Sequence, residues 1–392
     1  MRRFSANYIF TNTGNPIRNG VVGVDDNGKI IEIIDHKDGI KEYAHTEFRN
    51  GIIVPGFVNA HCHTELSHLK RKVEPKAGLA GFVNQIRNHR LAGEKGDEES
   101  ILNAIEQMAN SGTVAVADIC NTSHSFSPKQ KSGIKFINLI EVLGLEPEKA
   151  GSILERANAI SEVSANQFGM PAYITPHSTY SLSTKLWKDL AVILKNNPTV
   201  SIHFAESRDE ASFANKRTGG IYDNYVRWGL SFSDAPNASP VEILKRYLPK
   251  DSRLLLVHNT FMDEHQLDKV KDYFSNAYLV LCPSSNLYIE QTMPNVPMLS
   301  ASGIKIALGT DSLASSPTLS IFNQIQLILN HFPQIEFTQA LQWATICGAE
   351  ALGLEQNFGT IEKGKAPGLN LISPFNFSEM KPYPNSKVMA LL

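Results

Sequence analysis

Short apolar runs alternate with longer amphipathic stretches along most of the chain. The first 55 residues show strand patterns only, among them a hairpin in which Val21–Val24 and 29–34 flank an Asn-Gly turn. From Ile52 onward, β-branched runs alternate with segments of helical period, which predicts parallel βα units. The eight runs that favour strands are 52–59, 113–119, 136–143, 172–176, 199–204, 253–257, 278–282 and 305–309.

Eight strands are the number that a closed (β/α)8 TIM barrel requires, so we predict an α/β fold of this kind. The expected helices between the strands are 98–110, 149–162, 184–195, 264–274 and 320–330. A helical pattern at 338–352 then precedes an apolar run at 369–372. Because strand patterns occur at both ends of the chain, we expect a composite β-sandwich domain from 1–55 and 356–392, with the barrel of 56–355 inserted between them.

Composition and charge exclude several classes of protein. The chain has 392 residues, of which 42% are hydrophobic, and its 37 Lys and Arg against 39 Asp and Glu give no basic surplus for nucleic acid. Four widely spaced cysteines without a disulfide pattern indicate reduced thiols and a cytoplasmic location. The N-terminal segment is too polar for a signal peptide and no long apolar run follows, so we expect neither export nor a membrane span. The sequence leaves homo-oligomer formation open.

Histidines and one aspartate follow the predicted strands. They are His61 and His63 after the first strand, His177 after the fourth, His203 at the end of the fifth, His258 after the sixth and Asp311 after the eighth. The carboxyl ends of parallel barrel strands form one rim, where catalytic residues lie. Residues at i and i+2 of an extended segment point the same way. His61 and His63 can therefore face one ion while Cys62 faces the barrel wall.

A metal site explains this clustering. The imidazoles of His61, His63 and His203 together with the carboxylate of Asp311 form a mixed nitrogen and oxygen set that suits Zn²⁺ and also accommodates Fe²⁺ or Mn²⁺. A coordination position left open for water makes such a site catalytic. A His-x-His pair also occurs by chance in sheets, but the other rim residues at matching strand ends favour the metal.

Two further rim residues have the chemistry of proton transfer. Glu206 lies three residues after His203, where it can take a proton from an activated water and pass it on as a general acid–base. The alternative is a glutamate that stabilises a helix N-terminus. His258 can hydrogen-bond the attacking water, and its alternatives are a further metal ligand or a core imidazole.

Three residues are candidates for contact with a substrate. His177 is expected to meet the substrate because the metal shell is already filled, although a purely structural role is open. Glu65 and Ser67 continue the face of the His-x-His pair if the segment stays extended. Their alternative is a hydrogen bond that orders the loop. Ser284, Ser285 and Asn286 follow the seventh strand and lie on the same rim.

Taken together, these pieces resemble the amidohydrolase superfamily, and within it the cytosine deaminase-like and chlorohydrolase-like aminohydrolases. The matching segments are 55–63, 203–206, His258, 309–312 and, in the tail, 359–365. The resemblance implies the ligands His61, His63, His203 and Asp311, a proton-shuttling Glu206 and a water-orienting His258. Binuclear members carry a carboxylated lysine at the end of a middle strand, which the runs 136–143 and 172–176 lack. The resemblance thus implies one divalent metal.

The implied activity is hydrolytic deamination of a purine-type or pyrimidine-type heterocycle, with His258 and Asp311 holding the intermediate. Two segments depart from the pattern. The tail has 366–368 where many members carry an acidic residue, and 64–67 differs from the adenosine and S-adenosylhomocysteine deaminases. The latter segment is more similar to the aminofutalosine deaminases of menaquinone synthesis. Hydrolysis of another C–N or a C–Cl bond, and an inactive scaffold of the same fold, are the alternatives.

Overall fold

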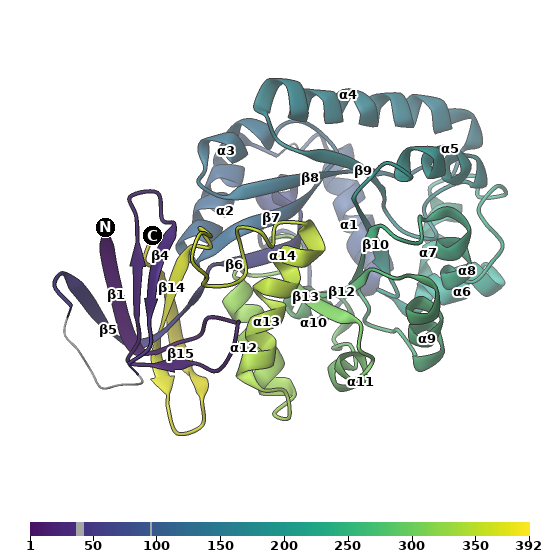
Figure 1. Cartoon of the computed structure of the whole chain (residues 1–392). Coiled ribbons are helices and arrows are strands. Elements are labelled where there is room, and N and C mark those ends of the chain that lie inside the picture. Colours follow the sequence, from purple (N-terminus) through teal and green to yellow (C-terminus); the bar gives the residue numbers. More distant parts are fainter. Residues whose placement is uncertain (37–42, 95) are drawn as a thin grey trace.

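Strands from both ends of the chain form one sheet in the computed structural model, which describes residues 1–36, 43–94 and 96–392. The strands are β1 (Arg2–Ile9), β2 (Ile17–Arg18), β3 (Val21–Val24), β4 (Ile30–Ile34), β5 (Thr46–Pro55), β14 (Leu369–Asn376) and β15 (Lys381–Ala390). Their order is β15-β14-β5-β1-β3-β4, with β2 paired to β1. Figure 1 shows these purple and yellow strands side by side at one end of the molecule.

Consecutive buried residues in several of these strands form the core of this sheet. The buried side chains of Phe4, Val22, Ile53 and Leu371 meet in one apolar cluster, and β3 is buried at every residue. The predicted hairpin is confirmed, because β3 and β4 pair antiparallel across the turn that follows Asp25.

The rest of the chain alternates strands and helices. Eight strands form two parallel sheets of four, in the orders β6-β7-β8-β9 and β10-β11-β12-β13. Their bounds are β6 (Phe57–Cys62), β7 (Thr113–Cys120), β8 (Lys135–Val142), β9 (Ala172–Pro176), β10 (Thr199–Phe204), β11 (Arg253–His258), β12 (Ala277–Leu281) and β13 (Lys305–Leu308). β6 and β10 are buried at every residue, which is typical of parallel strands covered on both faces.

Each predicted run contains a strand, but the extent of the first run is wrong. Residues 52–59 belong to two strands that part at Gly56. Val54 and Pro55 pair antiparallel with β14 in the terminal sheet, whereas Phe57 begins the pairing with β7. The apolar run is continuous because both strands are buried, so hydrophobicity does not mark the boundary between them.

The two parallel sheets approach each other at the carboxyl ends of their edge strands. The His203 amide donates to the His177 carbonyl over 2.9 Å, and the Thr310 and Asp311 amides donate to the His61 carbonyl over 2.9 and 3.1 Å. Short parallel bridges join Cys62 to Asp311 and His203 to the residue after His177. These backbone contacts bring together four of the rim residues expected to carry the chemistry.

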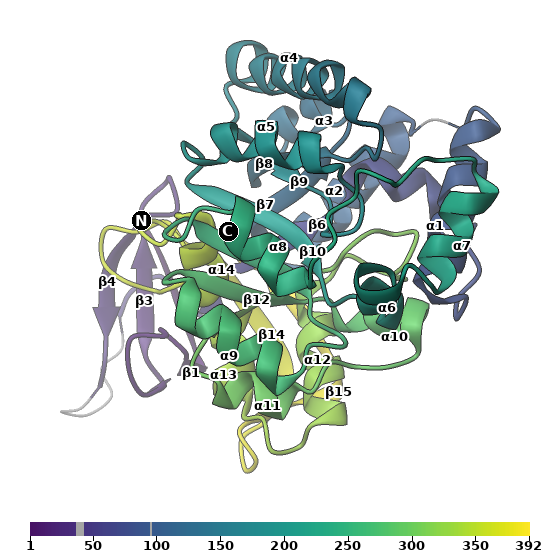
Figure 2. The ribbon, with the colours of Figure 1, turned by 90° about the vertical axis from the view of Figure 1, so that its right-hand side faces the viewer.

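Helices cover the outside of the parallel strands (Figures 1 and 2). They are α1 (Gly78–Leu91), α2 (Glu98–Asn110), α3 (Phe126–Lys131), α4 (Ala150–Phe168), α5 (Thr184–Leu194), α6 (Arg208–Lys216), α7 (Gly220–Arg227), α8 (Pro240–Tyr247), α9 (Glu264–Tyr273), α10 (Pro283–Glu290), α11 (Val296–Ala301), α12 (Ile321–His331), α13 (Phe337–Trp343) and α14 (Ile346–Leu352). The five helices expected between strands are confirmed as α2, α4, α5, α9 and α12.

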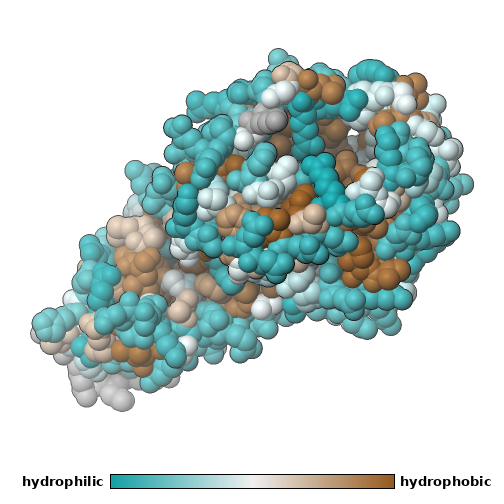
Figure 3. Space-filling view, turned by 90° about the horizontal axis from the view of Figure 1, so that it is seen from above, coloured by the Kyte–Doolittle hydropathy of each residue, from teal (hydrophilic) through white to brown (hydrophobic). Residues whose placement is uncertain are grey.

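The predicted helix at 338–352 is two helices, α13 and α14. They part at Thr345, whose backbone has φ −134° and ψ −91°, outside the helical region. On the face seen in Figure 3, hydrophilic residues predominate and apolar residues form separate patches. None of the helices in the described part of the chain combines the length and the apolar character needed to cross a bilayer.

Hydrogen bonds to the turn at Gly112, between α2 and β7, link the terminal sheet to the parallel strands. Gly112 has φ +85°, and a Cβ at this position would overlap the amide of Asn370 in β14. Its carbonyl accepts hydrogen bonds from the Phe57 amide over 2.9 Å and from Asn370 Nδ2 over 2.8 Å. The strained backbone conformation and the close approach both require glycine.

Gly112→Ala is therefore expected to lower the free energy of unfolding by about 1–3 kcal/mol, because alanine is strained at positive φ. Urea denaturation measures the change. Gly133→Ala is the matched control, since nothing lies near its added Cβ, and it should change stability by no more than about 0.5 kcal/mol. Equal urea midpoints for the two variants would contradict this account.

Candidate functional site

Four histidines and one aspartate converge at the carboxyl ends of the parallel strands. His61 and His63 come from the end of β6, His203 from β10, His258 from β11 and Asp311 from the segment after β13. The imidazole centroid of His61 lies 4.8 Å from that of His63, 5.0 Å from that of His203 and 5.8 Å from that of His258. The residues that were predicted to share one rim thus lie close together in space.

The donor atoms of this cluster fit a shared divalent ion. Nε2 of His61 lies 3.1 Å from Nε2 of His63, and Asp311 Oδ1 lies 3.8 and 3.5 Å from these two nitrogens. Tetrahedral Zn–N bonds of about 2.0–2.1 Å place two ligand nitrogens about 3.3 Å apart. His61, His203 and His258 also bring ligand atoms within 4.8 Å of one another. The residues present therefore fit a metal centre.

Asp311 is oriented by two hydroxyl groups. Its Oδ2 accepts hydrogen bonds of 2.6 Å from both Ser285 and Ser315, which leaves Oδ1 facing the histidines. Burial by itself would raise the pKa of this carboxyl, but His63, His258 and the two hydroxyls hold it at about 2. Asp311 is therefore an ionised carboxylate, the form that binds a cation.

Burial keeps the imidazoles neutral. It lowers the pKa of His63 to about 3 and also lowers the pKa values of His61 and His203. Nδ1 of His203 lies 2.9 Å from the His177 carbonyl, to which only a protonated nitrogen can donate. This contact fixes the tautomer and leaves Nε2 of His203 as the free nitrogen.

Glu206 and His258 form a pair beside these donors. Glu206 Oε1 lies 3.4 Å from His258 Nε2, and His258 Nδ1 lies 3.0 Å from Asn286 Oδ1. In the described residues, His258 Nε2 is buried without a hydrogen-bond partner. Burial raises the pKa of Glu206 to about 8, a value suited to a group that gives and takes protons near neutral pH.

Glu206 directly precedes the N-terminus of α6, the position that the alternative role of stabilising a helix N-terminus requires. The N-cap itself is Ser207, whose hydroxyl accepts a hydrogen bond from the Asp209 amide. The carboxylate of Glu206 lies beside His258 and is 8% exposed. Its geometry is that of a buried acid–base group, and its catalytic role stays a prediction.

His177 lies at the edge of the cluster. Its ring centroid is 4.8 Å from that of His203, and its Nδ1 lies 2.9 and 3.1 Å from the hydroxyls of Ser178 and Ser181. Burial and the charge of Arg90 lower its pKa to about 4. The predicted position at the rim is confirmed, and contact with a substrate stays a prediction.

The premise behind Glu65 and Ser67 is wrong, because the segment does not stay extended. Thr64–Leu69 forms a 3₁₀ helix, in which the period-two alternation is lost. The Glu65 carboxylate accepts hydrogen bonds from the Asn121 and Thr122 amides and from the Thr122 hydroxyl. Glu65 therefore orders the loop after β7, as the alternative interpretation proposed. The Ser67 hydroxyl is buried without a partner in the described residues.

A fully buried ion pair fixes the backbone at Thr64, directly after His63. Lys129 Nζ lies 2.5 Å from Asp118 Oδ2, and neither side chain is exposed. Asp118 also accepts hydrogen bonds from the amide and hydroxyl of Thr64, over 2.8 and 2.5 Å. This network turns the backbone into the 3₁₀ helix. Sequence analysis missed it, because an aspartate at a strand end and a lysine in a helix are ordinary when taken separately.

Two buried glutamates near the cluster were also missed as site residues. Glu141, at the end of β8, has Oε1 3.6 Å from His203 Nδ1. Glu210 accepts a hydrogen bond of 2.5 Å from Thr179, and burial raises its pKa to about 7. Glu141 lies near the carboxyl end of the mainly apolar strand β8, and this position could have identified it from the sequence as a site residue.

Comparison with known proteins defines the family. The sequence model of the amidohydrolase family matches residues 52–390. The chain belongs to the amidohydrolase family. An adenosine deaminase of Helicobacter pylori is 27% identical over 368 residues, which cover 91% of this chain and 87% of the relative. An aminodeoxyfutalosine deaminase of a Nitratiruptor species is 27% identical over 359 residues, which cover 88% of this chain and 85% of the relative.

Solved structures share the fold of this amidohydrolase. Helicobacter pylori aminofutalosine deaminase in complex with methylthio-coformycin superposes with a TM-score of 0.82 at 24% identity, covering 96% of this chain and 93% of that one. An adenosine deaminase from Xanthomonas campestris with bound zinc gives 0.74 at 20% identity, covering 94% and 84%. The chain thus has the mixed α/β fold of amidohydrolase structures.

Zinc is expected to stabilise the protein, and His203→Ala should weaken zinc affinity at least about tenfold because one nitrogen donor is lost. Thermal unfolding across a zinc titration of protein stripped with a chelator measures the affinity. His265→Ala is the control, since this histidine is exposed on α9 and should leave the affinity unchanged. If His203→Ala binds zinc as tightly as the wild type, His203 is not a ligand.

Proposed function

We propose that this amidohydrolase is a metal-dependent hydrolytic deaminase that removes the exocyclic amino group of a purine-type or pyrimidine-type heterocycle and releases ammonia. The observation that carries the proposal is the Glu206–His258 pair, 3.4 Å apart, beside a set of donors that fits a metal. Both relatives described above carry deaminase names. The reaction class is hydrolysis of a non-peptide carbon–nitrogen bond.

His61, His63, His203 and Asp311 would hold one divalent cation. Three imidazole nitrogens and one carboxylate oxygen favour Zn²⁺ and also accommodate Fe²⁺ or Mn²⁺. When bound, the cation supplies the positive charge that makes a water molecule acidic near neutral pH. A single ion is favoured because the carboxyl ends of β8 and β9 carry no lysine that could bridge a second one.

Side chains of this protein then transfer the protons and orient the attacking water. Glu206 takes a proton from the attacking water and delivers it to a ring nitrogen of the substrate. His258 donates from Nδ1 to Asn286, so its neutral Nε2 accepts a hydrogen bond from the water and orients it. His258 and Asp311 hold the hydroxyl of the tetrahedral adduct. Glu206 then takes the hydroxyl proton of the adduct and passes it to the amino group. The carbon–nitrogen bond breaks, ammonia leaves, and the ring keeps the oxygen of the water as a carbonyl.

The substrate that we favour is a nucleoside such as aminofutalosine or an adenosine derivative, on the support of the relatives' names. His177 is our candidate for contact with this substrate, because it adjoins His203 at the rim. Glu65 and Ser67 were also expected to contact it. Glu65 would do so only through the loop that it orders, and Ser67 has a buried hydroxyl that is free, among the described residues, for another donor or acceptor.

We also propose how the sheets are arranged into domains. The two parallel sheets would close into one barrel over 56–355, supported by the backbone bridges at both of their edges. The terminal strands of 1–55 and 356–392 would form a separate β-sandwich. All four cysteines are free thiols, which supports a reducing compartment such as the cytoplasm. The expected partner is a small heterocyclic molecule rather than nucleic acid or membrane, and homo-oligomers are compatible with it.

Ammonia release tests the reaction. Zinc-loaded protein is incubated with adenosine, aminofutalosine, 5-methylthioadenosine, cytosine and guanine, together with a chlorotriazine and a cyclic amide as other leaving groups. We expect ammonia from at least one aminated heterocycle. Chloride release or ring opening without ammonia would favour hydrolysis of a C–Cl bond or of another C–N bond. No turnover of any compound would favour an inactive scaffold of the same fold.

Glu206→Gln is expected to lose about 10²–10⁴-fold in kcat, because the amide cannot carry the proton. The same variant should bind zinc with unchanged affinity, since Glu206 is not one of the four donors. Steady-state kinetics and zinc titration provide the two measurements. Glu264→Gln, an exposed carboxyl on α9, is the control that keeps full activity. A Glu206→Gln enzyme with normal turnover would remove this residue from the mechanism.

A further inference from the structure

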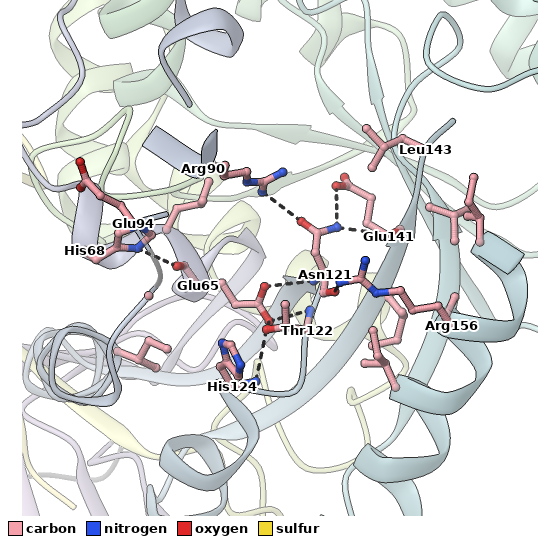
Figure 4. Close-up of a pocket in the computed structure, with 18 residues that line it drawn as sticks. Glu65, His68, Arg90, Glu94, Asn121, Thr122, His124, Glu141, Leu143 and Arg156 are labelled. Carbon is pink, nitrogen blue, oxygen red and sulfur yellow. Dashed lines mark hydrogen bonds between the residues drawn. The ribbon is translucent and has the colours of Figure 1, made fainter. Parts of the chain in front are cut away.

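Glu210 is a buried carboxyl group that the proposed reaction does not use. Two other glutamates near the cluster, Glu65 and Glu141, line a cavity of about 480 Å³ and accept hydrogen bonds from the loop after β7 (Figure 4). Glu210 lies instead in the first turn of α6, shortly after Glu206, and is only 1% exposed. A carboxyl group this deeply buried is costly unless its surroundings compensate it, so its contacts indicate its role.

The contacts of Glu210 join two loops of the rim. Its Oε1 accepts a hydrogen bond of 2.5 Å from the hydroxyl of Thr179, which belongs to the loop after β9. Thr179 is itself 1% exposed, and the preceding residue, Ser178, forms a backbone bridge to His203. The carboxyl of Glu210 therefore links α6 to the loop that carries His177.

The same carboxyl acts on the backbone that carries Glu206. Burial raises the pKa of Glu210 to about 7, while the Thr179 hydroxyl and the backbone amides of Glu206 and Ala205 act to lower it. The two amides can have this effect only if their N–H dipoles are directed toward the carboxyl. Oε2 of Glu210 accepts no hydrogen bond within the described residues, so this oxygen has capacity left for the two amides.

The backbone directly before Glu206 is strained. Ala205 has φ +47°, in the left-handed region that alanine rarely adopts. Its carbonyl accepts a hydrogen bond of 2.8 Å from the Phe261 amide, which ties it to the loop after β11. A conformation of this kind persists only where several contacts enforce it. Glu210 supplies a second contact, because it acts on the amide of Ala205 rather than on the carbonyl.

A cavity lies beside this strained segment. Its volume is about 360 Å³, and its lining includes Ala205, Ser207, Glu210 and Phe261. Backbone that borders a cavity has fewer apolar contacts than backbone in a packed core, and it opens more easily. Polar contacts must therefore hold the segment in place.

We propose that Glu210 is a positioning residue that holds the backbone at Ala205 and Glu206, so that the Glu206 carboxylate stays beside His258. The inference rests on the proposed function, because it assigns Glu210 to the acid–base group of that reaction. The alternative is that Glu210 only stabilises the N-terminus of α6, as acidic residues in a first helical turn do. Asp209 lies in the same turn and allows the two roles to be distinguished.

Glu210→Met removes both acceptor oxygens and keeps the length of the side chain. We expect kcat to fall about 10-fold to 100-fold, because a small misplacement of a catalytic group has an effect of this size. KM and the affinity for zinc should not change. Glu210→Gln keeps one acceptor oxygen and should recover part of the loss. Asp209→Asn, the control for negative charge in the first turn, should keep full activity.

A double-mutant cycle on kcat decides whether Glu210 acts through Glu206. In the Glu206→Gln background, Glu210→Met should change kcat by less than about twofold, since the group that it positions is already absent. The proposal is overturned if Glu210→Met lowers kcat by the same factor in both backgrounds, or if it leaves the kcat of the wild-type background unchanged.

Thr179→Val provides a second variant in case Glu210→Met does not fold. Valine has the shape of threonine but cannot donate to Oε1 of Glu210, so we expect kcat to fall about tenfold. Thr179→Ser keeps the hydroxyl and should retain a kcat near that of the wild type. Equal kcat values for the Val and Ser variants would contradict the proposal.

Amide hydrogen exchange separates this inference from the proposed function, because it needs no turnover. In zinc-loaded protein, Glu210→Met should accelerate exchange about 10-fold or more at the amides of 205–207. If no heterocycle is deaminated but exchange at these amides is faster, the proposed function fails and the positioning role stands. If deamination occurs and exchange is unchanged, the positioning role fails alone.

Discussion

The neutrality of the buried imidazoles is the constraint on which the rest of the site depends. His61 and His63 hold their Nε2 atoms 3.1 Å apart, a separation that two charged rings could not keep in a buried setting. Burial lowers the pKa of both rings, so each keeps a lone pair for a cation. One ionised group, Asp311, would offset part of the charge of such a divalent cation, and His63, His258 and its two serine partners keep the pKa of its carboxyl low.

The donor side chains are oriented mainly by backbone contacts between strands that are distant in sequence. The Asp311 amide bonds to the His61 carbonyl, and the His203 amide bonds to the His177 carbonyl. The Asp118–Lys129 pair adds a rigid turn directly after His63, at the cost of burying two charges. Because His61, His203 and Asp311 are held by neighbouring strand ends, the donor groups would need little rearrangement to meet one ion, which is the basis of a preorganised site.

Two buried carboxyl groups adjoin the histidine cluster in different surroundings. Glu206 adjoins His258 at 3.4 Å and carries a raised pKa near 8, so it is suited to move protons. Glu141 Oε1 lies 3.6 Å from His203 Nδ1, and Glu141 also lines a cavity of about 480 Å³ beside the cluster. The two carboxyl groups thus have different chemical surroundings, because their neighbours differ.

The sequence by itself determined the parallel strands, five of the helices between or after them and the rim residues, because the pattern of apolar residues and the His-x-His spacing are local properties of the chain. It could not separate β5 from β6, since both are buried throughout the apolar run at 52–59. Only the tertiary structure decided the turn into the 3₁₀ helix at Thr64, the Asp118–Lys129 pair and the cavity that Glu141, Arg90 and Arg156 help to line. These features arise from contacts between elements that share no sequence pattern, so their energies appear only when the elements are packed together.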